Sequence, residues 1–336
     1  MSDFNDKYLL FSLIHEFSYG KVSEEILSEE RSVVPNIENI VDSFLIGGII
    51  KQVVKVIEYD NKNYFGEIFN TSNTEVYTKK NIDLPSDCFF SDFYLELTVK
   101  KSKDTHYNGG LYPLKSFIKT QKGFVFKPYI KLNMEGNSSI IILEKISIGL
   151  SHELTHAYDY YMYFKKNGFP QSVNDFYKAG TQRFNNAKIS NNGVERVIGD
   201  IMYRLSQKEL NAYLGQLRTE LKFVATKIQD AKTAFNAIKE TSSYQKTYKF
   251  LEDEISYIVN NVEREDYQHL IIKYTNSVAN KNFTNYQQVV KYYFNRWYKW
   301  SETYLTKASK IAFDVFSESS NIGYEDDKTN SLKDTI

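Results

Sequence analysis

Residues Gly149 to Tyr160 read GLSHELTHAYDY and contain two histidines four positions apart. On a helix, His152 and His156 lie about one turn apart, so both imidazoles project from the same face. Two neutral imidazoles at that spacing can hold one Zn²⁺. Glu153 follows the first histidine directly, so its carboxylate can reach a water beside the ion rather than the ion itself. The pattern therefore predicts a metal site with Glu153 as its catalytic general base.

The residues around this stretch predict one long helix. The helix is expected from about Ser138 to Lys166, with Asn137 or Ser138 as its N-cap. Asn167 and Gly168 supply a stop signal at its other end. The motif therefore lies in the middle of the predicted helix.

Short alternating or β-branched runs upstream of this helix predict a small sheet. Strands are expected within 93–99 and 123–132, because both runs are rich in strand-forming residues. Turn residues at 108–110 and 135–137 are expected to separate the strands. The region 59–131 therefore contrasts with the helical sequence on either side.

Most of the remaining sequence has helical periodicity. Residues 5–58 are predicted to be mostly helical, and a loop is expected over 171–192. Helices are then predicted over 195–205, 207–239, 243–262 and 285–316. The order helix, sheet, then helices indicates an α+β fold. Four segments are expected: a helical N-terminal segment 1–58, a catalytic domain 59–240, a helical C-terminal subdomain 241–316 and a disordered acidic tail 317–336.

Charge and composition exclude several classes of function. Lys+Arg and Asp+Glu are balanced at 42 each, which argues against a nucleic-acid partner. The single cysteine, Cys88, excludes a disulfide scaffold and a thiolate zinc cluster. The apolar run 44–50 is too short to span a membrane, and the N-terminus lacks the features of a signal peptide. The expected location is the cytoplasm, or a virion if the gene belongs to a phage.

The segment HELTHA, with an Asp-Tyr pair just beyond it, resembles the HExxH zincin metallopeptidases. Met162 stands where metzincins place a third histidine, so the chain is most similar to the gluzincins, whose third ligand is a glutamate. The resemblance implies a zincin-like small sheet over an active-site helix, one Zn²⁺ per chain and a protein or peptide substrate. It also implies an edge strand that binds the substrate, with 109–112 or 124–132 as its counterpart here.

Glu209 is the predicted third ligand by the same resemblance. Ala212 and Tyr213 follow it with the spacing of a small residue and an aromatic in the second gluzincin helix. A different reading stays open, because Ser206 and Glu209 also form the Ser-x-x-Glu pattern of a capping box. Two further candidate ligands, Glu195 and Asp200, lie on the preceding predicted helix.

Several further residues are candidates for supporting roles. Asp159 either accepts a hydrogen bond from a ligand imidazole or is a solvated carboxylate on the helix face. His106, beside Gly109 and Gly110, either polarises a substrate carbonyl or is an exposed loop histidine. A site of this kind needs a hydrogen-bond donor to the transition state, and Tyr203 and Tyr213 are the tyrosines nearest to Glu209. Tyr213 is therefore a candidate for substrate binding.

The sequence is compatible with two classes of function. The favoured one is zinc-dependent hydrolysis of peptide bonds by a metalloprotease, with a water activated by Glu153. The alternative is a structural or virion-associated interaction protein that retains a zincin scaffold and assembles through its C-terminal helices, 195–316. A scaffold that has lost catalysis usually lacks the glutamate or one histidine, and this sequence retains all three.

Overall fold

The computed structural model describes residues 49–62, 64–68, 75–84, 91–120, 123–168, 182–224, 231–260 and 265–321. The chain forms two compact units. Of the described residues, the sheet unit holds 49–168 and 211–223, and the helical unit holds 182–210 and 224–321. One continuous helix, α11 (Gln207–Val224), contributes residues to both units.

The sheet unit is built on four strands, β1 (Glu75–Asp83), β2 (Asp92–Lys101), β3 (His106–Leu111) and β6 (Tyr129–Gly136). Their order across the sheet is β1-β2-β6-β3. β1 pairs antiparallel with β2, β2 pairs parallel with β6, and β6 pairs antiparallel with β3. β3 is therefore an edge strand, and no strand among the described residues pairs with its other edge, the open edge.

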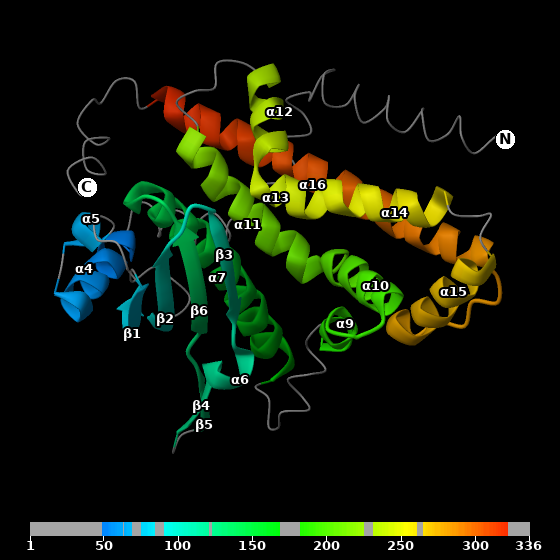
Figure 1. Cartoon of the computed structure of the whole chain (residues 1–336), viewed down its shortest axis with the longest axis horizontal. Helices are drawn as coiled ribbons and strands as arrows, with labels where there is room; N and C mark the ends of the chain where they lie inside the picture. Colours follow the sequence, from blue (N-terminus) through cyan, green and yellow to red (C-terminus); the bar gives the residue numbers. More distant parts are fainter. Residues whose placement is uncertain are drawn as a thin grey trace. The chain divides into compact units, whose positions relative to one another are not determined.

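One face of this sheet is apolar because buried and exposed residues alternate along its strands. The long helix α7 (Ser139–Asn167) packs on that face against β6 and β3, and α4 (Ile49–Asn61) packs beside β1 (Figure 1). Gly149 allows this approach, since a Cβ there would lie 3.0 Å from the Met134 side chain. The buried side chains on β1, β2 and β6 form one core with those of α4 and α7: Val76, Ile82, Phe93, Leu95, Leu97, Val99, Ile130, Leu132 and Met134.

The ends of α7 follow the sequence prediction. Ser138 is the N-cap, and its side chain accepts a hydrogen bond from the Ile141 N–H. The helix stops at Gly168, whose φ of 87° is a conformation that glycine adopts without strain. The prediction of a helix from about 138 to 166 is therefore confirmed.

The sheet differs from the sequence prediction in three places. Residues 123–132 form the end of a small hairpin and the start of β6, because β5 (Gly123–Phe126) pairs with β4 (Phe117–Thr120). Residues 108–110 lie inside β3, and Glu135 and Gly136 are the last two residues of β6, so the predictions of turns at 108–110 and 135–137 were wrong. The physical reason at 108–110 is close packing, because a Cβ on Gly109 would lie 2.8 Å from the Lys131 carbonyl oxygen on β6.

This packing gives a testable expectation for the edge strand. Gly109→Ala should destabilise the protein by about 1–3 kcal/mol, because the added methyl group would overlap both the Lys131 backbone and the Leu132 side chain. Gly110→Ala is the matched control, since a Cβ at Gly110 meets nothing within 4 Å. Thermal unfolding of both variants checks the expectation, and equal midpoints for the two would contradict the close approach.

The helical unit contains α9 (Gln182–Lys188), α10 (Gly193–Arg204), α12 (Ala231–Glu240), α13 (Ser242–Tyr244), α14 (Phe250–Asn260), α15 (Glu265–Ala279) and α16 (Tyr286–Asn321). α10 packs closely on α9, where a Cβ on Gly199 would lie 2.6 Å from the Ala187 Cβ. A π-helical turn, Gln245–Lys249, joins α13 to α14. Tyr248 on this turn packs against Trp300 and Tyr304 of α16, and these two rings stack at 5.1 Å.

The α+β class predicted from the sequence is confirmed by a small sheet and many helices. The structure adds α9, within the segment expected to be a loop, and α15, which was not predicted. Residues 5–58 were predicted to be mostly helical; of these, 49–58 are described and form part of α4, and the rest lie outside the described residues. The four predicted segments stay a prediction. No helix among the described residues is long and apolar enough to cross a bilayer.

Candidate metal centre

The buried middle of α7 carries the motif that the sequence singled out. His152, Glu153 and His156 are 8%, 7% and 9% exposed, because this part of α7 is covered on all sides. The two imidazoles lie on one face of the helix, with ring centroids 4.9 Å apart and planes at 86°. Their burial removes water from the imidazoles and leaves them close together, as the spacing predicts.

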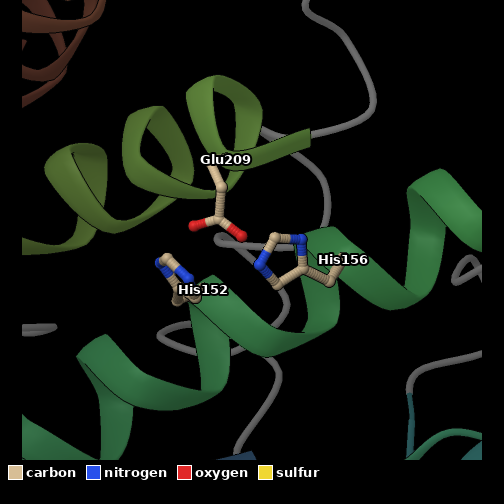
Figure 2. Close-up of side chains that lie close together, drawn as sticks. All are labelled: His152, His156 and Glu209. Carbon is tan, nitrogen blue, oxygen red and sulfur yellow. The ribbon is translucent and has the colours of Figure 1, made fainter. Parts of the chain in front are cut away.

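A carboxylate from α11 completes a group of three. Glu209 lies in the first turn of α11 and is 2% exposed. Figure 2 shows its carboxylate pointing toward the two imidazoles of α7. One potential ligand atom each from His152, His156 and Glu209 lies within 4.8 Å of the others, so the three side chains could hold a metal ion.

The chemistry of these donors fits zinc. Two imidazoles and one carboxylate form a three-ligand set that leaves a fourth tetrahedral position open. Bonds of about 2.0–2.2 Å to one tetrahedral ion would place the ligand atoms about 3.4 Å apart. The potential ligand atoms of the three side chains lie within 4.8 Å of one another, so the group is slightly wider than a site with the ion bound.

The helix cap at Ser206 does not compete with this role of Glu209. The Ser206 hydroxyl accepts a long hydrogen bond from the Glu209 backbone N–H, at 3.4 Å. The cap therefore uses the backbone of Glu209, while its carboxylate joins the histidines. In a full capping box the Glu209 carboxylate would accept from the Ser206 backbone N–H, but that N–H donates to the Tyr203 carbonyl oxygen at 3.0 Å.

Glu153 lies next to the group without belonging to it. Its Oε2 accepts a hydrogen bond of 2.6 Å from the backbone N–H of Leu111, the last residue of the edge strand β3. This bond orients the carboxylate and links the helix that carries the histidines to the open edge of the sheet. A carboxylate in this place can accept a proton close to the group.

Two predicted residues lie against the group. The Tyr213 ring packs edge-on against His152, with centroids 4.8 Å apart, and it is 8% exposed. Asp159 lies one turn beyond His156, and both of its oxygens accept from the Asn211 Nδ2 at 3.3 Å. Asp159 thus binds a side chain of α11, a partner that the sequence did not predict.

Other candidates do not belong to the three-residue group. Glu195 accepts from the Ser190 hydroxyl at 2.6 Å, and Asp200 forms ion pairs with Lys188 and Arg204. Neither acid belongs to the three-residue group. His106 is exposed at the start of β3, and Gly109 and Gly110 follow it on the same strand.

Sequence reasoning missed the side chains that hold α11 in place. Besides Asn211, the Gln216 side chain accepts from the Tyr107 hydroxyl of β3 at 3.1 Å and donates to Glu220 at 3.1 Å. The sequence does hold one signal for this arrangement. Glu209, Tyr213, Gln216 and Glu220 recur at helical spacing as a polar stripe, and all four are buried.

Comparisons with known proteins gave no match for this chain. No family model matches the chain, and neither does any curated protein or any solved structure.

Proposed function

We propose that the protein is a zinc-dependent metallopeptidase with the architecture of a gluzincin-type zincin. The observation that carries the proposal is the buried group of His152, His156 and Glu209, drawn from two helices. A second glutamate, Glu153, lies directly beside this group and outside it. Two imidazoles, one carboxylate ligand and a separate carboxylate base are the parts that metal-assisted peptide hydrolysis requires.

Each residue has a definite part in this chemistry. A zinc ion bound by His152, His156 and Glu209 would polarise the substrate carbonyl and lower the pKa of a bound water toward ~7. Glu153 takes a proton from the attacking water and delivers it to the leaving amine. The hydrogen bond from Leu111 keeps the Glu153 carboxylate in a fixed orientation for both transfers.

The open edge of β3 supplies a place for the peptide. The Leu111 N–H points away from β6, since it donates to Glu153, whereas the Tyr112 N–H donates to the Tyr129 carbonyl of β6. Backbone groups alternate in direction along a strand, so Gly109 presents its N–H and C=O on the open edge. A substrate that adds as a strand there would pass Glu153. The other candidate edge, 124–132, is less suitable, because β6 is paired on both sides.

Removal and restoration of metal test the proposal. Purified protein should contain about one zinc per chain, lose it to a strong chelator and regain it on addition of zinc. Cleavage of a mixed peptide library should disappear and return in parallel. The unfolding temperature should rise with zinc concentration, because the ion binds the folded state.

Two outcomes would count against the proposal in different ways. A chain that takes up no zinc, with an unfolding temperature that zinc does not change, would refute the metal site itself. A chain that binds zinc in the expected ratio yet cleaves no peptide in a broad library would refute the peptidase. That second result would favour an interaction protein built on the same scaffold.

A further inference from the structure

A pair of side chains next to the group joins its two helices. The Asn211 Nδ2 on α11 donates to both carboxylate oxygens of Asp159 on α7, each at 3.3 Å. Asp159 lies three residues after His156, and Asn211 lies two residues after Glu209. The contact is therefore within about 5 Å along each helix axis of a residue of the group.

We propose that Asp159 and Asn211 are positioning residues that hold Glu209 over the two histidines and so set the affinity for the metal. This inference rests on the proposed zinc site. In this proposal Asp159 fixes the position of the α11 backbone through Asn211. It does not orient a ligand imidazole. The proposal also gives a function to Asn211, which has no role as a ligand or base.

The geometry explains why Glu209 needs side chains that fix its position. His152 and His156 share one helix, so their mutual position is fixed by α7 alone. Glu209 comes from a second helix, and its carboxylate ends a stem with several rotatable bonds. Metal sites require ligand distances within about 0.2 Å, so a small shift of α11 would weaken the third bond.

α11 also has a side-chain contact with the sheet, which serves as an internal comparison. The Tyr107 hydroxyl of β3 donates to Gln216 at 3.1 Å. Gln216 lies seven residues beyond Glu209, about 10 Å along the helix. Tyr107→Phe would remove one side-chain hydrogen bond to the same helix, but far from the ligand.

Reciprocal exchange of the two side chains tests the proposal in the full-length protein. Asn211→Asp would place two carboxylates against each other and should weaken zinc binding by about 10–100-fold, the range for residues that support ligands. The double variant Asp159→Asn with Asn211→Asp restores a carboxylate–amide pair of the same shape and charge. It should bind zinc within about threefold of the wild type. Tyr107→Phe should leave zinc affinity unchanged. The measurement is a zinc dissociation constant from competition with a chromophoric chelator.

The possible results bear either on the role of the Asp159–Asn211 pair or on the zinc site itself. Wild-type affinity in Asn211→Asp would overturn the proposal, because the pair would then have no influence on the ligand. Weak binding that persists in the double variant would also overturn it, and would mean that Asp159 acts through another group such as an imidazole. An equal loss of affinity in Tyr107→Phe would show only a general effect of loosening α11. Absence of zinc binding in the wild type would instead refute the zinc site, and the proposed function with it.

Discussion

Glu153→Gln is expected to abolish peptide hydrolysis while the zinc content of the protein stays the same. The amide keeps the size of the side chain but cannot take a proton from water, so the rate should fall by at least ~10²–10⁴. The metal should remain, because Glu153 is not part of the group formed by His152, His156 and Glu209. The readout is a paired measurement of zinc per chain and turnover of a peptide that the wild type cleaves.

Glu144→Gln is the matched control for this substitution. Glu144 lies on the same helix, α7, nine residues before Glu153 and outside the group. The control should keep both zinc and activity. Loss of zinc in Glu153→Gln would contradict the assignment, because the residue would then be a ligand or a structural support rather than a base.

Glu209→Ala is expected to have the second large effect, on metal binding. Loss of one of three protein ligands should weaken zinc affinity by more than the 10–100-fold that supporting residues contribute. The stabilisation that zinc gives to the folded chain should fall accordingly. Titration with zinc, followed by the unfolding temperature, measures both effects in one experiment.

Ser206→Ala separates ligation from helix capping. This control removes the hydroxyl that caps the Glu209 N–H and leaves the Glu209 carboxylate in place. It should cost about 1 kcal/mol of stability and leave zinc affinity unchanged. If Glu209→Ala resembled Ser206→Ala, with lower stability and full zinc binding, Glu209 would be a capping residue and not a ligand.

Features that depend on neighbours in sequence were predictable. The helix α7 begins at Ser138 and stops at Gly168, because a cap and a left-handed glycine are local signals. The closeness of His152 and His156 follows from helical spacing alone. These signals act within a few residues, so no tertiary information is needed to read them.

The prediction of Glu209 as the third ligand needed more than signals from its sequence neighbours. Spacing places a carboxylate on a helix, but nothing in the spacing brings that helix to the histidines. The resemblance to the gluzincins supplied this step, and the structure brings the three side chains together. That the ion is zinc, and that the group is catalytic, are proposals for the experiments above.

Features that depend on distant partners were not predictable from one sequence. Asn211 and Asp159 are 52 residues apart, and Tyr107 and Gln216 are 109 apart. Hydrogen bonds of this kind leave no periodic pattern, since either partner is an ordinary polar residue on a helix or strand. The same cause explains the error at 108–110, where pairing with β6 overrides the turn preference of two glycines.

Anomalous diffraction at the zinc absorption edge, from crystals of the purified protein, will show whether His152, His156 and Glu209 together hold one zinc ion. We predict one peak per chain, about 2.0–2.2 Å from a nitrogen of each imidazole and from an oxygen of the Glu209 carboxylate. A chain without a peak at this group, or a peak whose ligands exclude Glu209, would contradict this prediction.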